Sequence, residues 1–511
     1  MKRVFRACAA GAASAVLFGN VCTVCGQANT AKPIPKTDPL EAEMRVVEPV
    51  AIGHHKQLFI DRYIIAKTDG VELTVTEPKR SPDNPCFCPD SDSDEGHGMI
   101  PDTVLYDRSR KLFRMWYTSM EGNADDQYPA YAESKDGIHW TRPSLNIRKF
   151  NGSTANNLMN GDPGVVIYDT HDMDPARRYK RIFTVENSGG VGVGVAFSPD
   201  GLHWTNSSAN PVLNHTGDTH SWLGWDERSQ RYIGYFRPHG ERQDVLVREQ
   251  KRRIGVSFSA DAVHWTPIEP IIESDAHDPP GTEFYWLHAI PYEDVYVGLL
   301  SVLHMDNNLL DFRQPDPVGR EQTVDMELVV SRDGVHWLRA NNRAAWLPLG
   351  RFQSWDDLTM WPSAPVVLDD EIRVYYSGWN LRHHLDDLSW SDKTRDGLWR
   401  VSCIGFASLR LDGWVAAHAV AHRSGTLVTR MLTFEGNSLE VNADAARGHL
   451  KVELLNAAGD PIPGFSGPDA ANITSDSLHQ KVVFAKPLPH IPVRIKFTLQ
   501  DAELYAFQFT D

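Results

Sequence analysis

Hydrophobic positions along the chain fall into short aromatic and β-branched runs that are broken by Asp, Gly and charged residues. No stretch of 15 residues keeps the 3.6-residue apolar period of an amphipathic helix, so the pattern predicts β-strands joined by turns. The clearest pairs of runs lie at 104–119, 165–186, 222–238, 289–303 and 365–379.

One heptapeptide pattern, Ser-x-Asp-Gly/Ala-x-His-Trp, occurs four times. The copies are SKDGIHW (134–140), SPDGLHW (198–204), SADAVHW (259–265) and SRDGVHW (331–337), and a degenerate fifth copy ends at Trp414. The closing tryptophans of the four copies lie 64, 61 and 72 residues apart. Three strands precede each copy and an outer strand follows it, so five such units predict a five-bladed β-propeller.

Two segments flank these units. Residues 58–80 have the pattern of a hairpin with a Thr-Asp-Gly turn, which either packs on the propeller or supplies an edge strand that closes it. After Trp414, alternating strands with a Gly-Asp-Pro turn continue for about 90 residues, the size of a small β-sandwich. We therefore predict an all-β chain with a propeller at 58–420, including the hairpin at 58–80, and a C-terminal β-sandwich at 421–511.

The N-terminus has the pattern of a signal peptide. Lys2, Arg3 and Arg6 precede an apolar, small-residue run at 7–24, which the sequence VCGQA follows. We assign residues 1–28 to the signal peptide and 29–57 to a linker. The mature protein is then expected to be exported, to the periplasm or the extracellular space, and no later segment approaches the length of a membrane span.

Charge and composition exclude some partners. The formal net charge is −16, so the chain would repel nucleic acid and anionic lipid. Beyond the signal peptide the cysteines are Cys86, Cys88 and Cys403, an odd number that indicates neither a disulfide framework nor a zinc site. The acidic run at 90–96 fits a solvated loop better than a calcium loop. We expect no metal and no cofactor, and the oligomeric state is open.

The five units, their closing motif and the following sandwich resemble the glycoside hydrolases of families 32 and 43, with family 32 the more similar because its members carry a C-terminal β-sandwich. The resemblance spans roughly residues 58–511. It implies three acidic residues at the propeller centre, each from the first strand of a different blade: a base or nucleophile, an orienting Asp and a Glu general acid. Such a set suits glycosidic cleavage, which needs one protonated and one ionised carboxyl.

Residue by residue, the resemblance is uneven. Asp162 in GDPGVVIY matches the Asp of the family's Arg-Asp-Pro segment, but Gly161 stands where the Arg would be. The family-32 Asn-Asp-Pro-Asn sequence of the first blade is absent. Asp102, directly before an apolar strand, is our candidate for the base or nucleophile.

The family's Glu-Cys-Pro segment is also absent. Glu283 precedes the strand of the fourth unit and is our candidate for the general acid, with Glu95, Asp218 and His220 as rivals. Trp222 and Trp361 are candidate platforms that would stack on sugar rings.

The repeated motif favours a structural interpretation. Residues that recur in every blade form a ring around the molecule, whereas one substrate needs one convergent site. The pattern also resembles the Asp-box of sialidase-like propellers, although its spacing is one residue shorter. The sequence thus predicts a secreted glycosidase acting on an oligo- or polysaccharide, with a non-catalytic carbohydrate-binding propeller as the alternative and a sialidase-like propeller as a lesser one.

Overall fold

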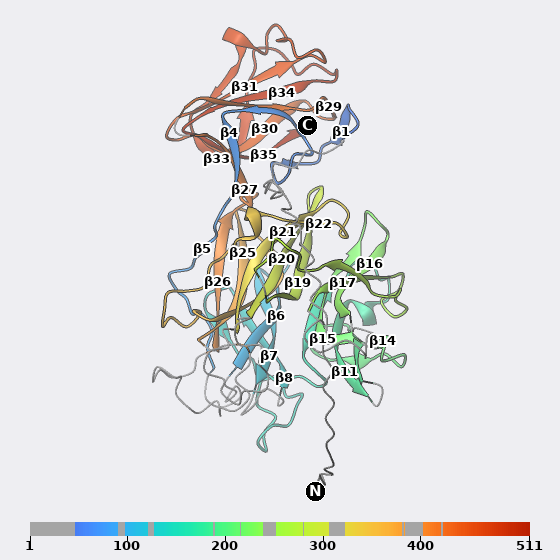
Figure 1. The fold of residues 1–511 in the computed structure, drawn as a ribbon. Coiled ribbons are helices and arrows are strands. Elements are labelled where there is room, and N and C mark those ends of the chain that lie inside the picture. Colours follow the sequence, from blue (N-terminus) through green and yellow to red (C-terminus); the bar gives the residue numbers. More distant parts are fainter. Residues whose placement is uncertain are drawn as a thin grey trace, which may run out of the picture. The chain divides into compact units, whose positions relative to one another are not determined.

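The structure is a computed structural model, and its fold is nearly all-β (Figure 1). It describes residues 46–89, 98–120, 127–187, 190–214, 216–238, 252–279, 281–305, 322–380, 383, 402–420 and 423–511. The predicted signal peptide (1–28), the acidic run at 90–96 and the rival site residue Glu95 lie outside the described residues. No helix of the described part is long and apolar enough to cross a membrane.

Three antiparallel sheets correspond to the first three predicted units, each with its strands in chain order. The first consists of β6 (Gly98–Asp107), β7 (Leu112–Met120), β8 (Gln127–Ser134) and β9 (Trp140–Thr141). The second consists of β10 (Gly164–Tyr168), β11 (Tyr179–Asn187), β12 (Gly190–Ser198), β13 (Thr205–Asn206) and β14 (Leu213–Asn214). The third consists of β15 (Thr216–Asp226), β16 (Arg231–Pro238), β17 (Ile254–Ser259) and β18 (Glu269–Ile272).

The fourth and fifth units share one nine-stranded sheet, which a single parallel pair, Val324 with Thr359, joins. The fourth unit contributes β19 (Thr282–Tyr292), β20 (Val295–Met305), β21 (Gln322–Ser331) and β22 (Trp337–Arg339). The fifth contributes β23 (Thr359–Pro362), β24 (Val366–Val367), β25 (Glu371–Trp379) and β26 (Ser402–Arg410). The outer strand of the fifth unit is β5 (Lys79–Arg80), so the N-terminal segment completes the last unit.

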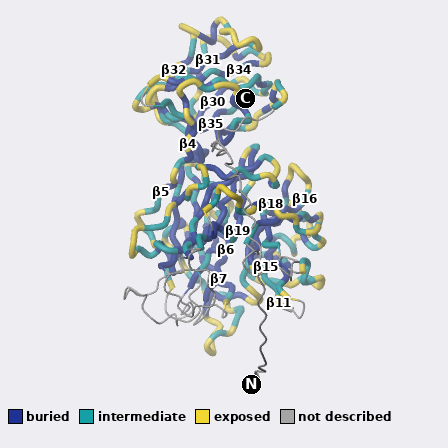
Figure 2. The backbone as a smooth tube through the Cα atoms, in the orientation of Figure 1, coloured by how far each residue is buried: buried dark blue, intermediate teal, exposed yellow. Residues whose placement is uncertain are grey.

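Neighbouring first strands are joined through side chains instead of backbone ladders. The Thr103 hydroxyl on β6 donates to Val166 O on β10 at 3.1 Å and accepts from Val166 N at 2.9 Å. Ser221 on β15 donates to Leu287 O on β19. β23 in turn contacts β6, so the first strands return to their starting point. Buried residues run along the strands, and exposed residues gather in the connecting turns (Figure 2).

The heptapeptide motif forms the turn after the third strand, and its backbone receives hydrogen bonds from the preceding unit. The residue after the motif's Asp has a positive φ, which favours glycine. The carbonyl of this residue accepts a hydrogen bond in three copies. Tyr375 Oη donates to Gly137 O (2.9 Å), Trp116 Nε1 donates to Gly201 O (2.6 Å), and Tyr235 Oη donates to Gly334 O (3.1 Å). Because Tyr375 belongs to the last unit and Gly137 to the first, these bonds also close the ring.

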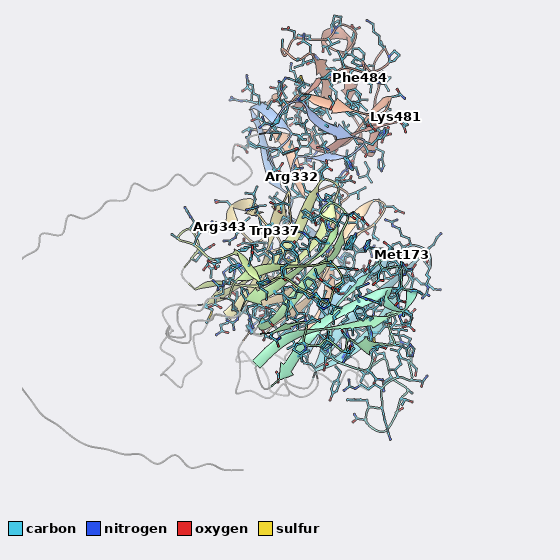
Figure 3. All side chains as sticks on the ribbon, turned by 90° about the vertical axis from the view of Figure 1, so that its right-hand side faces the viewer. Met173, Arg332, Trp337, Arg343, Lys481 and Phe484 are labelled. Atoms are coloured by element: carbon cyan, nitrogen blue, oxygen red, sulfur yellow. A yellow bond between two sulfur atoms is a disulfide. The ribbon has the colours of Figure 1, made fainter. Side chains whose placement is uncertain are left out.

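In the fourth copy the variable position has a role of its own. Arg332 donates from Nε and Nη2 to the carboxylate of Asp61, each at 2.8 Å. Figure 3 labels Arg332 and Trp337, the second and last residues of this copy. The motif therefore joins strands and units, as its repetition around a ring predicts.

Replacing the motif's aspartate tests this structural role. Asp200 Oδ1 accepts from the backbone N–H groups of Leu202 (2.8 Å) and His203 (2.9 Å), so Asp200→Ala leaves both donors of the turn without their partner. We expect the free energy of unfolding to fall by about 1–2 kcal/mol in urea titrations. His203→Ala, at an exposed ring, is the control with a smaller expected effect. Unchanged stability of Asp200→Ala would contradict this structural role of the motif.

Two further sheets form the C-terminal β-sandwich. One has the order β33-β30-β35-β27-β4 with β2 beside β35, and the other has the order β3-β28-β34-β31-β32. Their strands are β2 (Gln57–Leu58), β3 (Ile65–Asp69), β4 (Val71–Val75), β27 (Val415–Ala419), β28 (Gly425–Thr429), β30 (Ser438–Asp444), β31 (His449–Leu455), β32 (Ala471–Ile473), β33 (Asp476–Val482), β34 (Arg494–Gln500) and β35 (Glu503–Thr510). In addition, β1 (Val50–Gly53) pairs in parallel with β29 (Leu432–Phe434).

The predicted hairpin at 58–80 is wrong in its pairing. β3 pairs with β28 and β4 pairs with β27, so the two strands lie in different sheets of the sandwich, and the chain crosses between the sheets at Gly70. Only β5 joins the propeller sheets. The sandwich thus draws strands from 57–75, and its C-terminal part begins at Val415, before the predicted boundary at 421. The alternating pattern of 65–75 correctly indicated two strands but not their partners.

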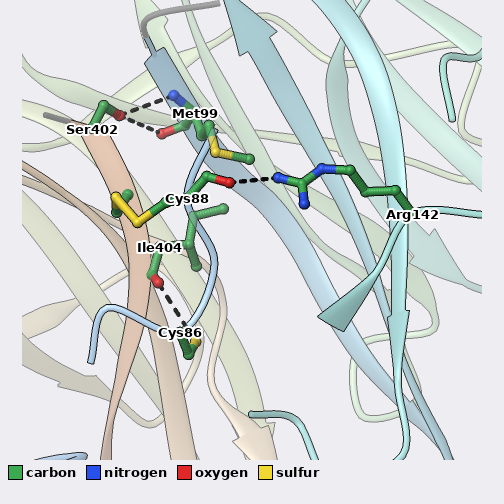
Figure 4. The surroundings of a disulfide bond; sticks show 7 residues. Cys86, Cys88, Met99, Arg142, Ser402 and Ile404 are labelled. Carbon is green, nitrogen blue, oxygen red and sulfur yellow. Dashed lines mark hydrogen bonds between the residues drawn. A yellow bond between two sulfur atoms is a disulfide. The ribbon is translucent and has the colours of Figure 1, made fainter. Parts of the chain in front are cut away.

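A disulfide that the cysteine count did not predict joins Cys88 to Cys403, 315 residues apart in sequence (Figure 4). Cys88 precedes β6 of the first unit and Cys403 lies on β26 of the last. Arg142 Nη2 donates to Cys88 O at 2.6 Å, and Ser402 Oγ bonds the backbone of Met99. Cys86 is a free thiol whose pKa burial raises to about 12. The disulfide covalently ties the first unit to the last.

Candidate functional site

The predicted acidic residues lie at one end of the propeller sheets, where the first strands begin; we call it the funnel end. The register pairs Gly98 with Met120, and Thr282 with His304, so second strands end where first strands start. The heptapeptide motifs follow the ends of the third strands and lie at the opposite end. The structure therefore separates the candidate catalysts from the motif.

Asp102 lies in a β-bulge of β6. The register shifts between Ile100 and Thr103, so β6 has one residue more than β7 there. Thr118 Oγ1 on β7 donates to Asp102 Oδ2 at 2.8 Å. Burial raises the pKa of Asp102 to about 7, against the opposing effects of the Thr118 hydrogen bond and the Arg181 charge. Burial therefore favours the protonated form of this carboxyl.

Arg181, on β11, lies near both Asp102 and Asp162. Burial lowers the pKa of Arg181 to about 10, and the charges of Asp162 and then Asp102 oppose that shift. The Arg181 side chain is buried, whereas Asp162 is exposed just before β10. The Arg181 guanidinium thus lies near two carboxyls, Asp102 and Asp162, that come from neighbouring sheets. The sequence did not reveal this arrangement.

Glu283 and Asp218 are held in ion pairs. Arg252 Nη1 donates to Glu283 Oε2 at 2.7 Å, and Arg237 pairs with Asp218. The guanidinium carbons of Arg237 and Arg252 lie 5.4 Å and 5.5 Å from the ring centroid of Tyr285. Arg252 therefore holds Glu283, the predicted general acid, in an ion pair.

His220 and His288 form a buried pair on the adjacent strands β15 and β19. Burial lowers the pKa of each to about 4, and the nearby His220 lowers that of His288 further. Both rings are therefore neutral at neutral pH. His220 Nδ1 has no hydrogen-bond partner in the described part of the chain. His220 is thus placed as a neutral group of the interior and not as an exposed acid or base.

This pair predicts acid sensitivity. The unfolded chain binds a proton at each histidine below pH 6.5, whereas the folded chain does not until about pH 4, so stability falls as pH falls through that window. Asp102 acts in the opposite sense because its folded pKa is raised. We expect His288→Gln to reduce the slope of unfolding free energy against pH between 6.5 and 4 by about 1.4 kcal/mol per pH unit. Urea titrations across this range measure it, and an unchanged slope would contradict the burial of a neutral His288.

The two tryptophans predicted to stack on sugars are both 4% exposed. Trp222 packs between the second and third sheets and donates from Nε1 to Val165 O at 3.2 Å, so its ring faces protein and not an open mouth. Trp361 lies at the funnel end with ring centroids 4.9 Å from Tyr285 and 5.0 Å from Trp286. Of this cluster, Tyr285 and Trp286 are the partly exposed rings. Neither predicted platform is open in this structure, because aromatic neighbours cover both.

Sequence reasoning missed the basic side chains of the site, Arg181, Arg237 and Arg252. The only signal for Arg181 is a charged residue in the interior of the run YKRIF, where strand alternation places it among buried residues. Within the described ranges no group of three or more His, Cys, Asp or Glu side chains is arranged to hold a metal ion. The described side chains of the site are carboxyls, guanidinium groups and aromatic rings.

A scan against protein-family models finds no match, and a search of curated proteins finds none either. Similar solved structures include an N-acetylgalactosamine deacetylase from F. plautii (16% identity, 67% of this chain and 96% of that chain, TM-score 0.42). A structure from the family-130 mannoside phosphorylases and glycoside hydrolases has 13% identity, covers 65% and 93%, and has a TM-score of 0.41. The family-32 β-fructofuranosidase of Bombyx mori has 11% identity, covers 83% and 93%, and has a TM-score of 0.39.

Structural neighbours of this chain thus include propeller glycoside hydrolases, as the sequence resemblance predicted.

Proposed function

We propose that this protein is an exported glycoside hydrolase with a five-bladed propeller, which cleaves glycosidic bonds of an oligo- or polysaccharide at the funnel end. The observation that carries the proposal is the pair Asp102 and Asp162, two carboxyls from neighbouring units beside one buried guanidinium. The Cys88–Cys403 disulfide supports export, because disulfides persist in oxidising compartments.

The two carboxyls have the different environments that glycosidic cleavage needs. Asp102, with its pKa raised to about 7 by burial, can donate a proton to the glycosidic oxygen as the bond to the anomeric carbon breaks. Asp162, exposed and beside Arg181, is the carboxylate that attacks the anomeric carbon or activates the water that does so. The proposal therefore gives Asp102 the acid role, in place of the base or nucleophile role predicted from sequence.

Glu283 takes a third role in this proposal. Its ion pair with Arg252 fixes an acceptor for sugar hydroxyls close to Tyr285, whose ring is partly exposed. Glu283 as general acid is the competing assignment. Under it, Asp102 would contribute little, and Arg252 would have to leave Glu283 when substrate binds.

The test is a screen for release of reducing sugar from plant and algal glycans and from aryl glycosides. Asp102→Asn, Asp162→Asn and Glu283→Gln are compared with Asp369→Asn, a matched change at an exposed carboxylate that pairs with Arg108 in a surface turn. We expect turnover by the unmodified protein and by Asp369→Asn, and its loss in Asp102→Asn and Asp162→Asn. Full activity in both of the latter would exclude this site.

A non-catalytic carbohydrate-binding propeller is the second candidate. It is favoured by the ion pairs of Glu283 with Arg252 and of Asp218 with Arg237. Two of the described candidate carboxylates are therefore already paired with arginines. Saturable glycan binding without turnover across the whole panel would establish it. A sialidase-like propeller, the lesser alternative, would show release of sialic acid in the same screen.

A further inference from the structure

Gly161 and Arg181 share one space beside the proposed acid and base. A Cβ atom built on Gly161 would lie 2.6 Å from Arg181 Nη2, closer than atoms approach without displacement. Gly161 has a φ of 86°, a left-handed conformation that favours glycine. A side chain at 161 and the present position of Arg181 therefore exclude each other. Glycine at 161 thus leaves room for the Arg181 guanidinium, which comes from β11, in its present position.

The Arg181 guanidinium has few local partners. Nη2 donates to Asn160 O at 3.3 Å, while Nε and Nη1 are buried and have no hydrogen-bond partner among the described residues. Its guanidinium carbon lies 4.6 Å from the ring centroid of Trp204, which supports the group without neutralising it. Buried polar groups normally have partners, so two unpaired N–H groups on a cation require an explanation.

The charge of Arg181 acts on Asp162 and Asp102 without a direct ion pair to either. Among the described residues, the neighbouring elements place Thr118 on β7, Asp162 before β10, Trp361 on β23, Trp379 on β25 and Ser402 on β26 at this end. Of the described cations, Arg181 is the one whose charge acts on Asp102.

We propose that Arg181 is a positioning residue of the Asp102–Asp162 pair, whose buried guanidinium beside Gly161 supplies positive charge to both carboxyls. The inference rests on the proposed function for its catalytic meaning, but the electrostatic relation can be measured without substrate. Because the side chain is buried, Arg181 acts through the two carboxyls and not by touching the sugar.

The test compares Arg181→Met, which removes the charge, with Arg181→Lys, which keeps it. The matched control is Arg108→Gln, which removes an exposed charge at the opposite end of β6. Protonation of Asp102 is followed by carboxyl infrared or ¹³C NMR titration of each folded protein, with Asp102→Asn to assign the signal. Circular dichroism and thermal unfolding establish that each variant is folded.

In Arg181→Met we expect the titration midpoint of Asp102 to rise by about one pH unit, because an opposite charge has been removed. The kcat is expected to fall by about 10–100-fold with little change in KM, and the alkaline limb of the pH–rate profile should move upward with the midpoint. Arg181→Lys should restore most of both, and Arg108→Gln should change neither.

The outcomes separate the two proposals. An unchanged Asp102 midpoint in folded Arg181→Met overturns the role of Arg181, whatever the activity. A shifted midpoint in a protein that cleaves no glycan supports the role of Arg181 and contradicts the proposed hydrolase. If Arg181→Met does not fold, the Arg181→Lys titration decides, because a retained charge predicts a midpoint within a few tenths of a unit of the unmodified protein, and a larger shift overturns the role.

Discussion

Asp102→Asn is expected to lower kcat by about 10²–10⁴-fold on glycosides whose leaving group is a sugar or another alcohol. The amide cannot supply the proton that such a leaving group needs as the glycosidic bond breaks. The burial that raises the pKa of Asp102 to about 7 also predicts that activity of the unmodified protein falls as pH rises through about 7, because the acid form is then lost. Initial rates across pH 4–9 measure both effects.

The leaving group distinguishes an acid from a base or nucleophile. The dinitrophenolate ion leaves a dinitrophenyl glycoside without being protonated. If Asp102 is the acid, Asp102→Asn should therefore retain most of the unmodified protein's rate on this substrate. Asp162→Asn should be inactive on both kinds of substrate, because the attack itself is lost. If Asp102→Asn loses activity equally on both kinds of substrate, Asp102 would be the base or nucleophile and Glu283 the acid.

Removing the Cys88–Cys403 disulfide is expected to cost about 2–5 kcal/mol of unfolding free energy. The bond closes a loop of 315 residues, so the unfolded chain gains much freedom when it is lost. In the folded state the disulfide holds Cys88 against β26. Beside it, Ile404 N donates to Phe87 O at 2.7 Å, and Phe87 N donates to Ile404 O at 3.1 Å. Urea titration of the double variant Cys88→Ser/Cys403→Ser measures the loss.

Cys86→Ser is the matched control, since it removes a thiol two residues away without breaking the bond. Reductant should destabilise Cys86→Ser and the unmodified protein but not the double variant. Equal stability of the double variant and Cys86→Ser would show that hydrogen bonds and apolar packing hold the first and last units together without the disulfide.

The motif and the strands show how far local pattern reaches. The four heptapeptides correctly marked the turn after each third strand, because a Ser, an Asp and a residue with positive φ bond their own backbone within seven residues. The runs from 104 to 379 likewise gave the strands of each unit. In these segments the stabilising contacts lie close in sequence, so the pattern contains them.

The candidate site was predicted only in part. Asp162 lies before β10 and Glu283 near the start of β19, because position along a strand follows from the hydrophobic run itself. Asp102, expected directly before a strand, is instead the fifth residue of β6. The chemistry of these carboxyls did not follow from the hydrophobic run. The ion pair of Glu283 with Arg252 and the burial of Asp102 depend on side chains from other strands, which no local periodicity encodes.

The sequence by itself determined that this chain is a series of β units, four of them with the motif after the third strand, followed by a further β region. Only the tertiary structure decided that 65–75 pairs with the sandwich, that Cys88 meets Cys403, and that Arg181 occupies the space beside Gly161. The physical reason is common to all three. Alternation and turn residues report how each segment is buried, whereas pairing, disulfide formation and electrostatics depend on which distant segment lies against it.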